Sequence, residues 1–210
     1  MKSFTWIKST FTIVPGIFYI LLVTGTAHAE TLSGEVLVKA LRQGGYAIVM
    51  RHANSPTAVP NKQTANADNT NLERQLSEAG RTGATAMGKA LRELKIPIGE
   101  VFTSPAYRAL ETAQLAQFTA PIKCEELGDR GHSMQDVSVA QSEWLQKKMA
   151  QVPTGSNRII VTHMPNITQA IPQVASGVSD GEALVFGSDG KGGTELVARI
   201  KIEEWQELAL

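Results

Sequence analysis

The chain has 210 residues, of which 42% are hydrophobic, and its 20 basic and 20 acidic side chains balance at pH 7. This balance predicts no binding to nucleic acid and no attraction to an anionic membrane surface. Cys124 is the only cysteine, which excludes an intramolecular disulfide, and no cysteine–histidine pair has the spacing of metal ligands. We therefore expect no metal and no other cofactor, and we interpret Cys124 as a small core residue rather than a nucleophile.

The first 29 residues have the pattern of a secretory signal peptide. Lys2 and Lys8 precede an apolar run over 11–23, and Ala27-His28-Ala29 places small residues where a signal peptidase requires them. The run is shorter than the roughly 20 residues of a membrane span, and an uncleaved anchor is the alternative. We expect cleavage after Ala29, a periplasmic protein without stable membrane association, and a single domain over residues 30–210.

The rest of the chain alternates between helical and strand patterns. Apolar residues recur at helical spacing over 32–41, and the apolar run 46–50 predicts a strand covered on both faces. A polar loop over 54–75 follows, and a helix is expected from Ser77 to a stop before Pro97.

The second half continues this alternation. After a strand over 100–103, Ser104 is a suitable N-cap and Pro105 a suitable first residue for a helix that carries Arg108. The elements expected further on are a strand at 122–124, a helix that follows a capping box at Ser133–Asp136, a strand over 158–162, a helix shortened by Pro172, and a hairpin of strands 182–186 and 194–202. The pattern predicts an α/β fold without a second domain.

Basic side chains follow three of the predicted strands. Arg51 and His52 come directly after the first strand, Arg108 follows the second, and His163 comes directly after the strand over 158–162. In an open α/β sheet, ligands bind beyond the carboxyl ends of the strands. Two planar guanidinium groups there predict a phosphate site, in which one neutral histidine attacks phosphorus and the other stabilises charge. The leaving oxygen then needs a carboxylic acid to protonate it.

Four motifs resemble those of the histidine phosphatase superfamily, which is also called phosphoglycerate mutase-like. They are Arg51-His52-Ala53, the segment 76–81 (LSEAGR), the segment 103–113 (TSPAYRALETA) and Val161-Thr162-His163, in the order in which the family carries them. The resemblance covers nearly all of residues 30–210 and is closest to small exported phosphatases. It implies a three-layer sandwich in which helices flank a mostly parallel sheet, and a phosphatase that hydrolyses phosphomonoesters.

The resemblance also implies roles for residues at the site. His52 is the histidine that becomes phosphorylated, and Arg51, Arg108 and His163 form the phosphate pocket. Apart from the resemblance, Arg74 at the end of the polar loop is a candidate substrate contact, with a solvated loop arginine as the alternative.

The general acid is the point at which the sequence departs from the family's patterns. The acid phosphatase and phytase branch pairs its second histidine with aspartate, but Met164 follows His163 here. The mutase-like branch places a glutamate in a Leu-x-Glu segment, with which Leu127-Gly128-Asp129 aligns. The resemblance therefore implies Asp129 as the acid. The alternatives are Glu182, Asp136 and Glu126, while His132 and Asp136 fit loop and cap positions.

Three functions are compatible with these residues. The leading hypothesis is an exported phosphatase that hydrolyses a small-molecule, glycan or lipid phosphomonoester through a phosphohistidine on His52. The alternatives are a phosphoglycerate mutase-like phosphotransferase and a non-catalytic module that binds a phosphorylated ligand in the same pocket. The sequence pattern predicts neither a particular substrate nor an oligomeric state.

Overall fold

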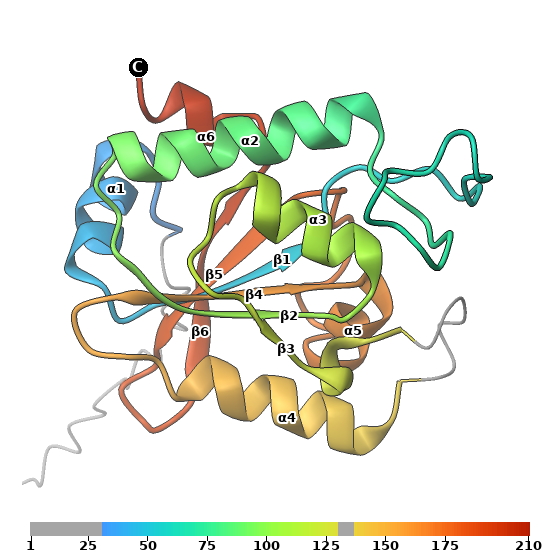
Figure 1. Ribbon diagram of the computed structural model, residues 1–210. Coiled ribbons are helices and arrows are strands. Elements are labelled where there is room, and N and C mark those ends of the chain that lie inside the picture. Colours follow the sequence, from blue (N-terminus) through green and yellow to red (C-terminus); the bar gives the residue numbers. More distant parts are fainter. Residues whose placement is uncertain (1–30, 130–136) are drawn as a thin grey trace, which may run out of the picture.

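The computed structural model describes residues 31–129 and 137–210 (Figure 1). The signal peptide expected over residues 1–29 and the capping box expected at Ser133–Asp136 lie outside the described residues. Among the helices of these two ranges, none is both long enough and apolar enough to cross a membrane.

The described part of the chain contains a single six-stranded mixed sheet. Its strands are β1 (Ala47–Arg51), β2 (Ile98–Thr103), β3 (Ile122–Lys123), β4 (Asn157–Thr162), β5 (Ala183–Ser188) and β6 (Thr194–Ile200). They lie in the order β3-β2-β4-β1-β5-β6, with the first four parallel to one another. The predicted hairpin is present as β5 and β6, which are antiparallel to each other, and β5 is antiparallel to β1.

Helices cover both faces of this sheet. They are α1 (Gly34–Gln43), α2 (Glu78–Glu93), α3 (Tyr107–Leu115), α4 (Val139–Ala150), α5 (Met164–Ala170) and α6 (Glu204–Glu207), with the 3₁₀ turn η1 at Glu125–Leu127. In Figure 1, α1, α2, α3 and α6 lie above the sheet, and α4 and α5 lie below it. The fold is therefore the predicted α/β sandwich with a mostly parallel central sheet.

Successive residues of the central strands supply two separate hydrophobic cores. Side chains alternate between the faces of a strand, so Ile48 and Met50 join one core and Ala47 and Val49 join the other. The first core contains buried residues of α1, α2, α3 and α6, and the second contains those of α4 and α5. Burial on both faces explains the apolar runs 47–50 in β1 and 159–161 in β4.

Two predicted helix starts were wrong. Helix α3 begins at Tyr107 with Ala106 as its N-cap, because the Ser104 hydroxyl accepts the backbone N–H of Ala106 and also contacts a histidine ring. Helix α4 is capped by Ser138, whose side chain and that of Gln141 form a reciprocal capping box. The sequence contains this Ser-x-x-Gln motif at Ser138, five residues after Ser133, where the cap was predicted.

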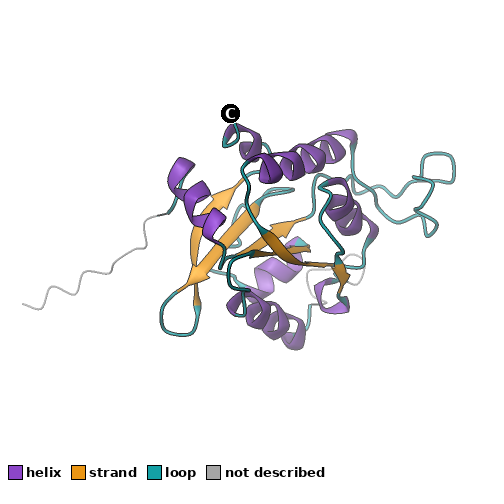
Figure 2. Cartoon of the chain, turned by 60° about the vertical axis from the view of Figure 1, so that its left-hand side comes forward, coloured by secondary structure: helices purple, strands orange, loops and turns teal. Residues whose placement is uncertain are grey.

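No helix or strand interrupts the chain between β1 and α2, as the polar composition predicted. Figure 2 shows this stretch as a loop that extends from the side of the molecule. Glu111 of α3 holds its end, because its carboxylate accepts the backbone N–H of Leu76 at 2.7 Å and the side-chain amide of Asn66 at 2.8 Å. The loop is therefore attached to the same helix that carries Arg108.

Candidate active site

His52 lies immediately beyond β1 and is fixed by the backbone on both sides. Its N–H donates to the Thr162 carbonyl at 3.0 Å, and its carbonyl accepts the N–H of Gly181 at 2.9 Å. The imidazole is only 3% exposed, and its Nδ1 lies 2.8 Å from the carbonyl oxygen of Ala53. Because a carbonyl can only accept, Nδ1 carries the proton, and the Nε2 lone pair is left for nucleophilic attack.

The surroundings of His52 keep its imidazole neutral. Burial lowers the pKa of His52 to about 4, and the positive charges of Arg108 and Arg51 act in the same direction. A histidine must be neutral to attack phosphorus, so this electrostatic setting suits a nucleophile at neutral pH.

His163 follows β4 and stands beside His52, with 5.3 Å between the two ring centroids. Its Nδ1 lies 3.0 Å from Nη2 of Arg108, and its Nε2 lies 2.7 Å from the hydroxyl oxygen of Ser104. A guanidinium only donates, so Nδ1 is the acceptor and Nε2–H donates to Ser104. Burial first, and then the charge of Arg108, lowers the pKa of His163 well below 6.5, so this ring is neutral as well.

The two arginines present unsatisfied donors beside these rings. Arg51 directs Nη1 to the Val178 carbonyl at 3.2 Å and Nη2 to the Asp180 carboxylate at 2.7 Å. Arg108, the second residue of α3, is buried and forms an ion pair with Asp129 through Nη2. Within the described residues, the Nε–H groups of both arginines are buried without a hydrogen-bond partner. Because such groups are rare in native proteins, the pair indicates an oxyanion site.

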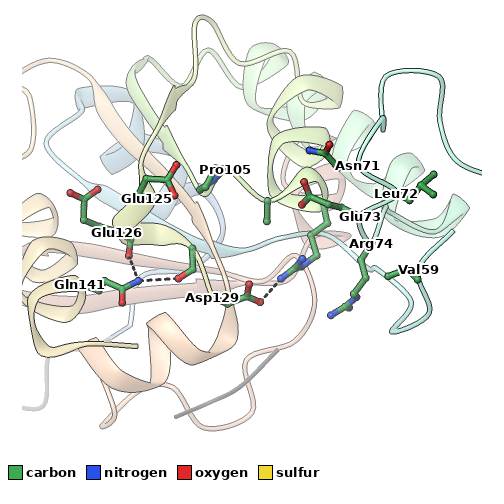
Figure 3. A pocket seen from close by; sticks show the side chains of 13 residues that line it. Val59, Asn71, Leu72, Glu73, Arg74, Pro105, Glu125, Glu126, Asp129 and Gln141 are labelled. Carbon is green, nitrogen blue, oxygen red and sulfur yellow. Dashed lines mark hydrogen bonds and ion pairs between the residues drawn. The ribbon is translucent and has the colours of Figure 1, made fainter. Parts of the chain in front are cut away.

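A cavity of about 700 Å³ opens next to this cluster (Figure 3). Arg108 and Asp129 line it, together with parts of the loop after β1 and the segment 125–128. Arg74 lies on its wall with its side chain partly exposed, and it is held by hydrogen bonds to the carbonyls of Pro56 at 2.7 Å and Ser55 at 2.9 Å. The structure thus places Arg74 on a cavity that Arg108, one residue of the predicted phosphate pocket, also lines.

The candidate acids differ in their contacts. One carboxylate oxygen of Asp129 contacts Arg108 and lies 3.6 Å from Nδ1 of His163. Glu182 instead accepts from Nε of Arg199 at 2.6 Å and from the backbone N–H of Ser179 at 2.8 Å. Burial raises the pKa of Glu182, but these two hydrogen bonds outweigh it and lower the pKa, which disfavours a proton donor.

The remaining alternatives are less well placed. Glu126 lines the cavity, but Figure 3 shows its carboxylate on the far side of Asp129 from Arg74. Asp136 and His132 lie outside the described residues. Cys124 is half-buried against the second core, and burial raises the pKa of its thiol, as expected of a packing residue rather than a nucleophile.

Sequence reasoning missed Asp180 and underrated Ser104. Asp180 lies in a Ser-Asp-Gly segment before β5, which resembles an ordinary turn. Nothing local in that segment indicates that its carboxylate reaches Arg51. Ser104 was expected to cap a helix, and its contact with His163 depends on the adjacency of β2 and β4.

Neutral, buried His52 makes the stability of the fold depend on pH. The pKa of His52 is about 4 in the folded protein, against an ordinary value of 6.5. Below pH 6.5 the unfolded chain therefore binds a proton that the folded chain does not, so stability is complete above pH 6.5 and falls as the pH drops towards 4. We expect the unfolding free energy to lose roughly 3 kcal/mol from this residue across that interval.

Urea denaturation of the wild-type protein and of His52→Asn between pH 7.5 and pH 4 measures this effect. The variant lacks the titrating ring, so its stability should fall less steeply over the same interval. Equal slopes for the two proteins would show that His52 is not held neutral by the fold.

The sheet and the site together define a class of protein. Buried, neutral histidines and two arginines meet where the parallel strands β1, β2 and β4 end, beside a cavity lined by a carboxylate. This arrangement is typical of an α/β protein that binds phosphate and has a nitrogen nucleophile available for phosphoryl transfer.

Comparison with known proteins agrees with this class. The family model of the histidine phosphatase superfamily (branch 1) matches residues 47–130, a range that contains Arg51, His52, Arg108 and Asp129. The resemblance that the motifs indicate is therefore confirmed, and the match supports a phosphatase or a phosphotransferase. No curated protein sequence is similar enough to the chain to count as a match.

Solved structures share the fold at low sequence identity. The protein histidine phosphatase SixA complexed with tungstate has a TM-score of 0.53 and 15% identity, over 76% of this chain and 98% of that one. A phosphoserine phosphatase from Entamoeba histolytica in complex with phosphoserine has a TM-score of 0.52 and 14% identity, over 75% and 98%. A mycobacterial glucosyl-3-phosphoglycerate phosphatase has a TM-score of 0.50 and 16% identity, over 74% and 100%.

Proposed function

We propose that the protein is a phosphatase that hydrolyses phosphomonoesters through a phosphohistidine on His52. The observation that carries the proposal is the buried, neutral His52 ring, whose Nε2 is unprotonated beside two arginines with unpaired Nε–H groups. A phosphate placed there would accept from both guanidinium groups while its phosphorus faces the histidine.

The proposed reaction has two steps. Nε2 of His52 forms a bond to phosphorus as the ester oxygen leaves. Asp129 takes up a proton when the bound phosphate replaces it as the partner of Arg108, and it gives that proton to the leaving oxygen. A water molecule then attacks the phosphohistidine, Asp129 takes a proton from it, and inorganic phosphate and free His52 result. Arg51, Arg108 and His163 stabilise the charge on the phosphoryl oxygens in both steps.

Release of inorganic phosphate by the purified protein tests this function. We expect turnover of p-nitrophenyl phosphate and of alkyl phosphates, together with an acid-labile, base-stable phosphoenzyme trapped by rapid quench. Transfer of the phosphoryl group to a second substrate molecule without phosphate release would instead indicate a phosphotransferase. The absence of even a single turnover would indicate a non-catalytic module that binds a phosphorylated ligand. A screen of phosphorylated sugars, lipids and nucleotides would then identify the substrate class.

Asp129→Asn should separate two kinds of substrate. An alkyl phosphate needs its leaving oxygen protonated, whereas nitrophenolate leaves without help, so the general acid matters only for the first. We expect kcat for alkyl phosphates to fall about 10²–10⁴-fold, and kcat for p-nitrophenyl phosphate to fall much less.

Glu126→Gln is the matched control, because Glu126 also lines the cavity and was an alternative acid. It should leave the ratio between the two substrates unchanged. Equal losses on both substrates in Asp129→Asn would indicate that Asp129 only pairs with Arg108.

We also propose that the protein is exported and that residues 30–210 are its mature, single domain. Residues 1–29 lie outside the described residues, so support comes from the sequence, in which two lysines, a short apolar run and Ala27-His28-Ala29 follow in order. N-terminal sequencing of the protein from a periplasmic extract should give Glu30 as the first residue. A protein that retains Met1, or one found only in the cytoplasm, would contradict export.

A further inference from the structure

Asp180 holds the head of the first phosphate-site arginine. It lies in the turn before β5, and its Oδ1 is 2.7 Å from Nη2 of Arg51. The carbonyl of Val178 in the same turn accepts from Nη1 of Arg51 at 3.2 Å. Nη1 of the guanidinium is therefore held by a hydrogen bond, and Nη2 by an ion pair in which Oδ1 of Asp180 accepts no hydrogen bond. The buried Nε is the guanidinium nitrogen that has no partner in the described residues.

The other oxygen of Asp180 is held by a chain of polar side chains. Asn54 donates its amide to Oδ2 of Asp180 at 2.8 Å, and the Ser77 hydroxyl donates to the amide oxygen of Asn54 at 2.6 Å. The Ser77 oxygen in turn accepts the N–H of Gly80 and so caps α2. A Cβ atom on Gly80 would lie 2.2 Å from the Asn54 carbonyl oxygen, so glycine at this position permits the close contact between α2 and Asn54.

The ion pair between Arg51 and Asp180 favours ligand binding because it fixes the guanidinium, and it adds little to the stability of the fold. The side chains of Arg51 and Asp180 are 27% and 24% exposed, and partly solvated ion pairs add little to stability. An arginine side chain, however, has about 2 kcal/mol of rotamer entropy to lose when a ligand fixes it. Contacts that fix the guanidinium before the ligand arrives remove this cost from binding and from the transition state.

We propose that Asp180 is a positioning residue that, supported by Asn54 and Ser77, orients Arg51 so that its Nε–H faces the phosphate. This inference rests on the proposed function, because the phosphate is that of the proposed substrate. It also assigns a role to the Ser77–Asn54–Asp180 series of contacts, which connects the start of α2 to the phosphate site.

The test compares Asp180→Ala with Asp180→Asn. We expect Asp180→Ala to raise the inhibition constant of inorganic phosphate about 10-fold and to lower kcat/KM for p-nitrophenyl phosphate up to about 10²-fold. Asp180→Asn keeps an oxygen for Arg51, and a turn of the Asn54 amide satisfies the new NH₂ group. That variant should therefore stay within about 3-fold of wild type, because it keeps both the oxygen that faces Nη2 and the contact with Asn54 and loses only the charge of the ion pair.

Two further variants separate positioning from general structural damage. Asn54→Ala combined with Asp180→Ala should lose no more than Asp180→Ala alone, because residues in one chain of contacts are not additive. Glu100→Ala is the matched control, since it breaks an arginine–carboxylate pair with Arg158 at the opposite end of β4. It should leave the inhibition constant of phosphate unchanged.

Other outcomes overturn the inference. Tighter phosphate inhibition in Asp180→Ala would show that the carboxylate competes with phosphate for Arg51. Unchanged kinetics in Asp180→Ala, or failure of Asp180→Asn to restore them in a folded protein, would remove Asp180 from the site. If the wild-type protein turns over substrate and His52→Ala does not, such results reject only the role of Asp180. If the wild-type protein is itself inactive, the proposed function fails first.

Discussion

His52→Ala is expected to abolish phosphatase activity, with a drop in kcat on the order of 10⁵–10⁶-fold, as for loss of other covalent nucleophiles. The reason is that Nε2 of His52 is the unprotonated nitrogen that forms the bond to phosphorus, and no other neutral ring has a free nitrogen in the described site. Steady-state assays with p-nitrophenyl phosphate measure the loss, and rapid acid or base quench should show that the phosphoenzyme is absent. Circular dichroism and thermal melting should show an intact fold.

Cys124→Ser is the control for the identity of the nucleophile. Cys124 is the only thiol in the chain, and its raised pKa disfavours the reactive thiolate. This variant should keep wild-type kcat and wild-type phosphoenzyme. Near-normal activity in His52→Ala, or a phosphoenzyme that is stable to acid, would exclude the phosphohistidine mechanism.

Arg108→Ala is expected to lose about 10²–10³-fold in kcat/KM. Arg108 contributes an unpaired Nε–H to the phosphate site, contacts Nδ1 of His163 and pairs with Asp129, so three parts of the site lose a partner at once. Arg108→Lys should recover only part of the loss, because an ammonium cannot replace the planar fork. The inhibition constant of inorganic phosphate should rise in both variants.

Arg92→Ala serves as the matched control for this prediction. Arg92 lies on α2 and donates to the backbone carbonyl of Ala116, away from the two histidines. Its removal should change kcat/KM less than 3-fold, the scale of a single neutral hydrogen bond in a partly exposed position. An Arg108→Ala variant as active as Arg92→Ala would place Arg108 outside the reaction.

Local sequence was sufficient to predict the central strands and the basic residues that follow them. The apolar runs 47–50 and 159–161 identified β1 and β4, because strands buried on both faces have apolar central residues. The sequence predicted that Arg51, His52 and His163 lie close together, since the carboxyl ends of parallel strands lie at one edge of a sheet, and the rings of His52 and His163 are 5.3 Å apart. The motifs, and with them the family resemblance, come from these same positions.

The helix starts were less predictable, because competing caps look alike in the sequence. Ser104 and Ser138 both precede segments with helical patterns, and of these two only Ser138 is the N-cap of the helix that follows. The Ser104 hydroxyl contacts His163 instead, a choice that depends on β2 lying next to β4.

The sequence alone therefore predicts an α/β fold, with two arginines and two histidines just beyond the ends of strands. The tertiary structure decides what each of them contacts. Arg51 forms an ion pair with Asp180, Arg108 with Asp129, and Arg199 with Glu182. The physical reason is that hydrogen bonding and burial depend on residues far apart in the chain, such as Arg51 and Val178, which are 127 positions apart. Strand order and the turns between elements bring such pairs together, and the local pattern of polar and apolar residues predicts neither.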